Sequence, residues 1–148
     1  MTTTTGHDII GDIHGEAAQL ERLLARLGYR ETGGAYSHPE GRRAVFLGDL
    51  IDRGPDILRT LRVVRAMAKA WRALAFIGNH ELNALRYHAR DASGEPLRPH
   101  GRMNRAQHDA TLRQIAEPHP GEWADHLEWF AGLPLWLDLG GVRVVHAA

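Results

Sequence analysis

One pattern occurs three times in the sequence: a short apolar run stops at a glycine, and side chains with oxygen or imidazole donors follow. The central copy, residues 46–56, reads FLGDLIDRGPD, and the other two copies lie at residues 7–15 and 74–81. After each copy, the sequence continues into a helix-forming segment. Because short apolar runs separated by helices are typical of buried parallel strands, this pattern predicts an α/β fold.

The remaining segments complete this expectation. Residues 29–43 contain paired glycines and indicate a hairpin-like excursion, and the Gly- and Arg-rich residues 89–105 indicate an irregular loop. With no linker in sight, residues 1–148 are predicted to form one domain. Strands are expected at 7–10, 44–47, 71–77, 135–139 and 142–145. The last two are expected to form a hairpin about residues 140–141, with the final strand ending at the same edge of the sheet as the first three. Helices are expected after residues 15, 56 and 78 and at 106–115 and 121–132.

Composition narrows the possible partners and the compartment. Lys and Arg total 18, as do Asp and Glu, so no net charge attracts nucleic acid or an anionic membrane. We therefore expect neither as a partner. The chain has no cysteine, which suits a reducing compartment. Its first residues lack the basic and apolar segments of a signal peptide, and we expect a cytoplasmic protein.

The donor side chains follow strand ends, where open α/β sheets bind their ligands. Taken singly, Asp12 could be a helix-entry turn residue and His14 a surface histidine. Taken together, the donors suit Mn²⁺, Fe or Zn²⁺, and a glycine before a donor lets the backbone approach a crowded centre. Five donors exceed the needs of one open site, so they indicate two ions about 3.5–4 Å apart. The candidate metal ligands are Asp12, His14, Asp49, Asn79 and His146.

Three further residues fit the hydrolysis of a phosphorus ester by in-line attack of hydroxide. Arg53 offers a guanidinium group for phosphate oxygens. His80 could protonate the leaving oxygen, and Asp52 could orient that imidazole. The loop arginines 90, 98, 102 and 105 could meet substrate or solvent. Dinucleotide-binding, P-loop and serine-hydrolase motifs (GxGxxG, GxxxxGK[ST] and GxSxG) are absent.

The motifs also resemble those of a known family. The blocks GDIHG, GDLIDRGP, GNHE and VHA, at residues 11–15, 48–55, 78–81 and 145–147, are similar to the signature blocks of calcineurin-like metallophosphoesterases. The DRGP continuation resembles the branch of phosphoprotein phosphatases and bacterial symmetrical diadenosine tetraphosphatases. The resemblance implies a metallophosphoesterase-like αββα sandwich and two metal ions, most simply Mn²⁺.

The resemblance also implies roles for single residues. Asp12 and His14 would bind the first metal, and Asp49 would bridge both ions. Asn79 and His146 would bind the second metal.

The same resemblance assigns the substrate-handling residues. Arg53 would bind phosphate, together with Asn79. The Asp52–His80 pair would donate the proton. Substrates implied are a phosphoprotein, a small phosphomonoester or a dinucleoside polyphosphate.

At its C-terminal end the sequence departs from the family pattern. The family pattern continues after the VHA block and supplies another metal-binding histidine, whereas this sequence ends at Ala148. We therefore expect the N-terminal part of the sandwich, a weaker second metal site and self-association through an exposed sheet edge. The leading hypothesis is a dinuclear phosphoesterase. The alternatives are a catalytically compromised fragment that binds metal or nucleotide, and a metal-dependent nuclease.

Overall fold

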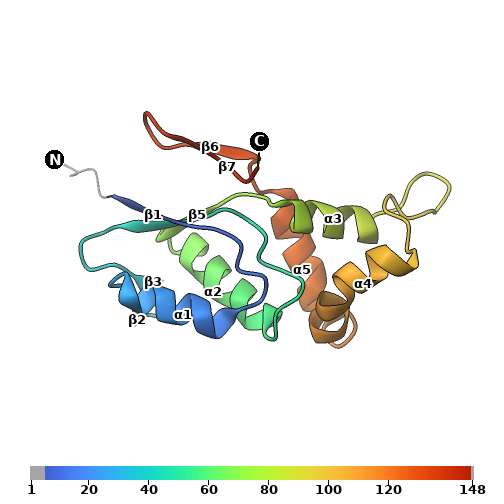
Figure 1. The fold of residues 1–148 in the computed structure, drawn as a ribbon, viewed down its shortest axis with the longest axis horizontal. Helices are drawn as coiled ribbons and strands as arrows, with labels where there is room; N and C mark the ends of the chain where they lie inside the picture. The colour runs from blue at the N-terminus through green and yellow to red at the C-terminus, as the bar shows by residue number, and fades with distance from the viewer. Residues whose placement is uncertain (1–5, 148) are drawn as a thin grey trace.

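Three short parallel strands form the central sheet of the structure, a computed structural model that describes residues 6–147 (Figure 1). They are β1 (His7–Ile10), β4 (Arg43–Phe46) and β5 (Ala73–Ala75), in the order β1-β4-β5. Ile10 pairs with Phe46, and Phe46 pairs with Ala75. This register aligns the carboxyl ends of all three strands, so the loops that follow them start at one edge of the sheet.

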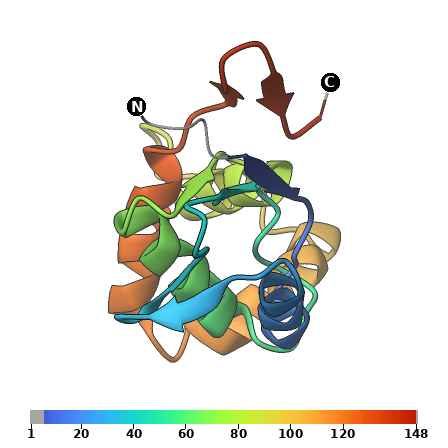
Figure 2. The same ribbon diagram turned by 90° about the vertical axis from the view of Figure 1, so that its left-hand side faces the viewer.

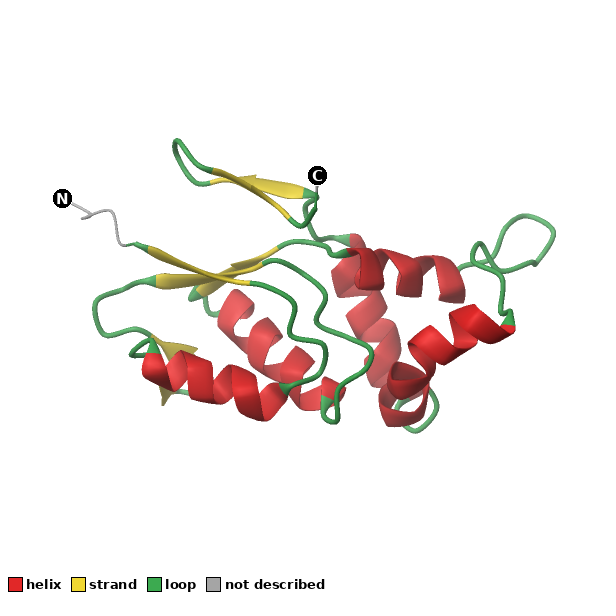
Figure 3. Cartoon of the chain, in the orientation of Figure 1, coloured by secondary structure: helices red, strands yellow, loops and turns green. Residues whose placement is uncertain are grey.

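Both faces of the middle strand, β4, are buried. On one face lie α1 (Ala17–Arg26) and α2 (Ile57–Lys69), as Figure 3 shows. Phe46 belongs to the core on this helical side, whereas its neighbour Val45 belongs to a second cluster. Since successive side chains of a strand point to opposite faces, two separate apolar layers explain why these strands read as continuous apolar runs.

The second layer is a hairpin of β6 (Trp136–Asp138) and β7 (Arg143–Val145). It lies across the central sheet from α1 and α2 (Figure 2). The predicted hairpin is confirmed, but the expectation that its second strand shares the central sheet is wrong. The two strands pair only with each other, because Val144 packs face to face on Val45 and Phe76 instead of extending the ladder. The layer order of helices, sheet and second sheet matches the predicted metallophosphoesterase-like α/β fold.

The predicted strand at residues 71–77 is shorter than expected, because α2 ends in a Schellman motif. Trp71 adopts a left-handed conformation with φ of 58°. Its N–H donates to the carbonyl of Ala68, and the N–H of Arg72 donates to that of Met67 at 2.9 Å. A bulky residue is unusual at this position, where glycine is the common choice, so the sequence carried no stop signal. The strand starts only at Ala73.

The other helices gather near the carboxyl ends of the strands. The excursion after α1 is the predicted hairpin, β2 (Arg30–Thr32) with β3 (Ala35–Ser37). The helix expected at 106–115 begins earlier, within the segment expected to be a loop, and ends in a π-helical turn. No helix in residues 6–147 is long and apolar enough to cross a membrane. The elements here are α3 (Asn79–His88), α4 (Arg102–Thr111), the turn Leu112–Ala116 and α5 (Pro120–Ala131).

The α2–α5 contact contains a buried histidine that responds to pH. His126 is 1% exposed, and its Nδ1 lies 3.1 Å from a nitrogen of Arg65, the donor. Burial and the positive charge of Arg65 lower the pKa of His126 from 6.5 to about 4, although Glu122 opposes the shift. At neutral pH the ring is therefore uncharged.

The free energy of unfolding should consequently fall between pH 6.5 and pH 4, because the unfolded chain binds a proton there that the folded chain excludes. We expect this ring to contribute roughly 2 kcal/mol to the loss. Urea unfolding measured across this range should show a smaller loss for His126→Gln. The exposed His119→Gln variant should keep the wild-type slope. An unchanged slope in the His126 variant would contradict the assignment.

Candidate active site

The loops that follow β1 and β4 are joined through their backbones at the sheet edge. The N–H of His14 donates to the carbonyl of Asp49 at 2.8 Å, and the N–H of Gly15 donates to that of Leu50 at 2.9 Å. In the other direction, the N–H of Gly54 donates to the carbonyl of His14 at 2.8 Å. These bonds fix the spacing between the loops without using the functional side chains.

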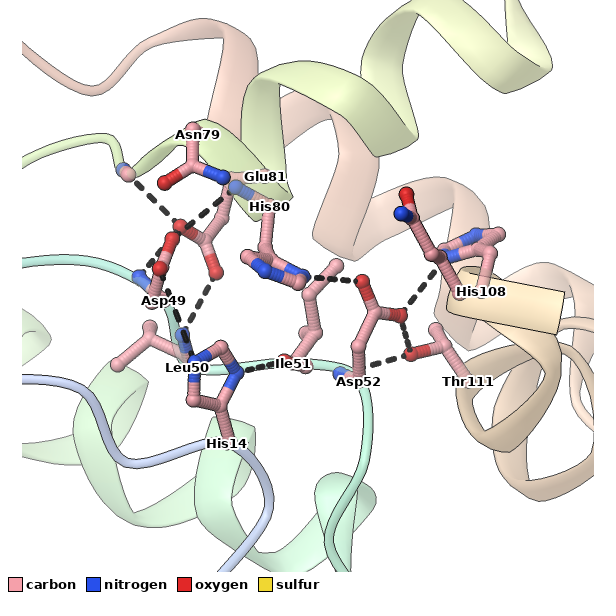
Figure 4. A network of polar contacts seen from close by, with 12 residues as sticks. His14, Asp49, Leu50, Ile51, Asp52, Asn79, His80, Glu81, His108 and Thr111 are labelled. Atoms are coloured by element: carbon pink, nitrogen blue, oxygen red, sulfur yellow. Dashed lines mark hydrogen bonds and ion pairs between the residues drawn. The ribbon is translucent and has the colours of Figure 1, made fainter. Parts of the chain in front are cut away.

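A buried carboxylate joins the β4 loop to the start of α3. Glu81 is fully buried and accepts hydrogen bonds from the N–H groups of Asp49 at 2.8 Å, Leu50 at 2.7 Å and Gly78 at 3.0 Å (Figure 4). Burial raises the pKa of Glu81, whereas the N–H groups of Leu50, Asp49 and Gly78 oppose that shift. Because all three partners are donors, the ionised form is the one that fits them. Sequence reasoning assigned Glu81 no role, although it is the last residue of GNHE.

Two of the three glycines that precede donor residues allow a close backbone approach. A Cβ on Gly48 would collide with the backbone of Gly78, and a Cβ on Gly78 would collide with the backbone of Asp49. At Gly11 a Cβ would meet only a methyl carbon of Leu47 at 3.7 Å, an ordinary contact. The expectation of crowding is therefore right for the second and third copies of the pattern and wrong for the first.

Several site residues have unusual backbone conformations. Positive φ angles occur at His14 (44°), Asp49 (52°), Asp52 (67°) and Arg53 (70°). Non-glycine residues in this region cost of order 1 kcal/mol or more each, and they cluster at functional sites. All four strained residues are ones that the sequence predicts to bind metal or substrate or to take part in proton transfer.

Asp49 stands at the centre of the candidate metal ligands. Donor atoms of Asp12, Asp49 and His146 lie within 4.8 Å of one another, and so do those of His14, Asp49 and His80. The Nε2 of His146 is 3.3 Å from a carboxylate oxygen of Asp49 and 2.9 Å from the amide oxygen of Asn79. The structure thus brings all five predicted ligands to one place.

The grouping differs in one respect from that implied by the resemblance. Asp12 and His14 were expected to share one ion. In the structure Asp12 falls in a group with His146, while His14 falls in a group with His80. Asp49 belongs to both groups, as a bridging ligand would.

The two ligand histidines are oriented for metal binding. The Nδ1 of His14 lies 2.8 Å from the carbonyl oxygen of Ile51, and the Nδ1 of His146 lies 2.6 Å from that of Leu47. A carbonyl only accepts, so each Nδ1 donates a hydrogen bond there, and each Nε2 faces the carboxylate of Asp49, where a cation would take its lone pair. This is the usual outer-shell arrangement of metal-binding histidines, and the donor set therefore fits a divalent cation.

Asp52 and His80 form the predicted pair. The Nδ1 of His80 donates to a carboxylate oxygen of Asp52 at 2.6 Å. This hydrogen bond raises the pKa of His80 above its ordinary value, against the effect of burial. The imidazole is thus biased toward the protonated form that a proton donor requires.

Sequence reasoning missed two partners of Asp52. His108 and Thr111, both on α4, bind the other carboxylate oxygen of Asp52 at 2.8 Å and 2.6 Å. No motif marks His108 among the ten histidines of the chain. Its spacing of three from Thr111 places both on one helical face, but only the fold shows that this face meets Asp52.

The predicted phosphate ligand Arg53 is exposed and borders a polar cavity of about 480 Å³. Asn79 and His80 open onto the same cavity from α3, and Arg113 does so from the π-helical turn. A phosphate ester placed here would meet the guanidinium group of Arg53 and the His80 ring, beside Arg113, whose Nε already donates to Asp109 at 2.7 Å.

The fold agrees with the comparisons with known proteins. The model of the calcineurin-like phosphoesterase family matches residues 8–148, and the chain belongs to this family.

Two curated relatives carry more specific names. An asymmetrical bis(5'-nucleosyl)-tetraphosphatase, PrpE of Oceanobacillus iheyensis, is 32% identical over 95% of this chain. A symmetrical bis(5'-nucleosyl)-tetraphosphatase of Aromatoleum aromaticum is 34% identical over 93% of it. The chain covers 54% and 42% of these relatives, respectively.

A solved structure shows the same fold. A crystal structure described as a candidate diadenosine tetraphosphatase matches with a TM-score of 0.61 and 24% identity, over 99% of this chain and 52% of that one.

Replacing Glu81 tests the backbone clamp, the three hydrogen bonds that its carboxylate accepts from the N–H groups of Asp49, Leu50 and Gly78. In Glu81→Gln an amide N–H₂ would face backbone N–H donors, and at least one buried donor would lose its acceptor. We expect a loss of about 3 kcal/mol in the free energy of unfolding. Urea denaturation would measure it, with the exposed Glu128→Gln as the matched control, expected to change stability by about 0.5 kcal/mol or less. Equal stabilities of the two variants would refute the clamp.

Proposed function

We propose that this chain carries the active-site residues of a metal-dependent phosphoesterase that acts on dinucleoside polyphosphates. The observation that carries the proposal is the meeting of three features at one sheet edge. Asp49 joins two ligand groups, the Asp52–His80 pair adjoins them, and a cavity with Arg53 and Arg113 opens beside His80. Metal ligands alone would need neither the acid pair nor the arginines.

The ligand roles follow the donor geometry. Asp12, His14, Asp49, Asn79 and His146 would hold two divalent cations, with Mn²⁺ as our choice because oxygen and imidazole donors suit it. When bound, such ions lower the pKa of a coordinated water and neutralise phosphate charge.

The chain's own groups supply the remaining chemistry. Arg53 binds the phosphate oxygens with its guanidinium group. His80, held by Asp52, presents its Nε2 toward the leaving oxygen and donates a proton to it.

The names of the relatives favour a dinucleoside polyphosphate over a phosphoprotein as the substrate, since both are tetraphosphatases. One relative is named as a symmetrical and the other as an asymmetrical tetraphosphatase, so their names do not select which phosphate bond of the substrate is cleaved. The polar cavity with two arginines suits a substrate with several phosphates.

A second candidate function is a binding module without turnover. This module would bind Mn²⁺ and nucleotide at the same residues.

Hydrolysis of diadenosine tetraphosphate tests the proposal. The chain should release nucleotides in the presence of Mn²⁺ and stop when a chelator is added. Chromatography of the products would separate ADP alone from ATP with AMP, and so identify the symmetrical or asymmetrical cleavage. Asp49→Asn should lose activity about a hundredfold or more, since it weakens a ligand of both groups. Metal binding without hydrolysis would favour the binding module.

His80→Ala should separate chemistry from metal binding. We expect turnover of glycerol phosphate, whose alkoxide needs a proton to leave, to fall roughly a hundredfold, the scale of one acid catalyst. Calorimetric titration with Mn²⁺ should give an affinity within a few-fold of the wild type, because the proposed ligand set excludes His80. Loss of the bound metal in this variant would instead make His80 a ligand, as its place beside His14 and Asp49 allows.

A further inference from the structure

A series of hydrogen-bonded side chains extends from the Asp52–His80 pair into the region where α3, α4 and α5 pack. His108 is 5% exposed. Its Nδ1 lies 2.8 Å from Asp52, and its Nε2 lies 3.1 Å from the Nε2 of His88 on α3. The indole N–H of Trp123 on α5 reaches the same Nε2 of His88 at 3.2 Å. Side chains from α5, α3 and α4 thus form one hydrogen-bonded chain that ends at the Asp52 carboxylate.

The direction of these hydrogen bonds follows from Trp123, because an indole nitrogen can only donate. The Nε2 of His88 must therefore accept and carries no proton. Burial, together with the charges of His108 and His100, lowers the pKa of His88 to about 4, which keeps this ring neutral. The Nε2 of His108 faces an acceptor and must itself donate. The two bonds, at 3.1 and 3.2 Å, are long, as expected when two donors share one lone pair.

The other nitrogen of His108 faces the carboxylate of Asp52, which can only accept when ionised. Burial alone would raise the pKa of Asp52, but hydrogen bonds from His108, His80 and Thr111 outweigh it and hold the pKa well below its usual range. The Nδ1 of His108 must therefore donate as well. Both ring nitrogens of His108 are donors, so the ring is an imidazolium.

The surroundings of His108 are compatible with that charge. From α3 it meets His88 and the ring of Tyr87, whose centroid is 5.1 Å away. His100 stacks on the Tyr87 ring with centroids 3.8 Å apart, and Arg98 lines the same small hollow as His108. Asp52, from the β4 loop, is the acid in this set and the counter-ion to His108.

We propose that His108 is a doubly protonated positioning residue that fixes the Asp52 carboxylate and thereby orients His80. Thr111 assists, since its hydroxyl accepts from the N–H of Asp52 at 3.1 Å and donates to the carboxylate at 2.6 Å. Held from one side by α4, the carboxylate keeps its other oxygen aimed at His80 (Figure 4). The effect on turnover rests on the proposed function, whereas the protonation state of His108 does not.

Nitrogen-15 NMR of the imidazole rings at neutral pH tests the protonation state on the chain as it is, without metal or substrate. Disappearance of signals in His108→Gln and in His88→Gln assigns each ring. The expected result is a proton on both nitrogens of His108 and on Nδ1 alone of His88. A His108 ring with one unprotonated nitrogen would overturn the proposal.

Kinetics with two phosphomonoesters tests the positioning role. p-Nitrophenolate leaves without a proton, whereas the alkoxide of glycerol phosphate needs one. His108→Leu should lower kcat for glycerol phosphate about tenfold more than for p-nitrophenyl phosphate, with KM little changed. His108→Gln, which keeps an N–H donor for Asp52, should restore part of this difference.

The control is His100→Gln, since His100 touches Tyr87 but not Asp52. It should affect both substrates equally. Equal losses on both substrates in His108→Leu would contradict the positioning role. If the wild-type chain cleaves neither these esters nor diadenosine tetraphosphate, the proposed function fails, and the NMR result alone decides the state of His108.

Discussion

The buried carboxylate of Glu81 is the interaction on which the site depends. Its two oxygens accept the N–H groups of Asp49, Leu50 and Gly78, and so tie the loop after β4 to the start of α3. A carboxylate that accepts several N–H bonds in the interior is costly to bury but very costly to disrupt. The distance between Asp49 and Asn79 is consequently set by a residue that performs no chemistry of its own.

This clamp explains how strained residues persist. Four site residues, His14, Asp49, Asp52 and Arg53, hold left-handed conformations, and each costs free energy that a flexible loop would release. The bonds between the β1 and β4 loops and the glycine contacts at Gly48 and Gly78 leave the loops no room to relax. Such rigidity is what places several donors around one point before any ligand arrives.

The sequence predicted most of this site, for a physical reason. An apolar run followed by a glycine and a polar residue marks the end of a strand in this sequence. Because parallel strands bring their carboxyl ends together, Asp12, Asp49 and Asn79 could be assigned to one edge of the sheet. The parallel sheet, the helices and both hairpins follow from the same local signals.

The parts that sequence did not predict depend on contacts between distant segments. His108 differs from the other histidines only in the helix face that meets Asp52. The hairpin of β6 and β7 belongs to a second sheet because of how Val144 packs on Val45 and Phe76, which local periodicity cannot show. The short β5 reflects Trp71 in a left-handed turn, a position where the common residue is glycine.

The location of His146 has a consequence for how the two sheets are held together. It is the candidate ligand that comes from the second sheet, while Asp49 follows the central one. Besides a small apolar cluster, the two layers share the hydrogen bond between His146 and the carbonyl of Leu47 and the one from the N–H of Ile77 to the carbonyl of Pro134. A cation held by both side chains would act as a cross-link between layers. Metal affinity and hairpin docking are therefore reciprocal quantities, and metal supply would govern the architecture of the molecule as well as its chemistry.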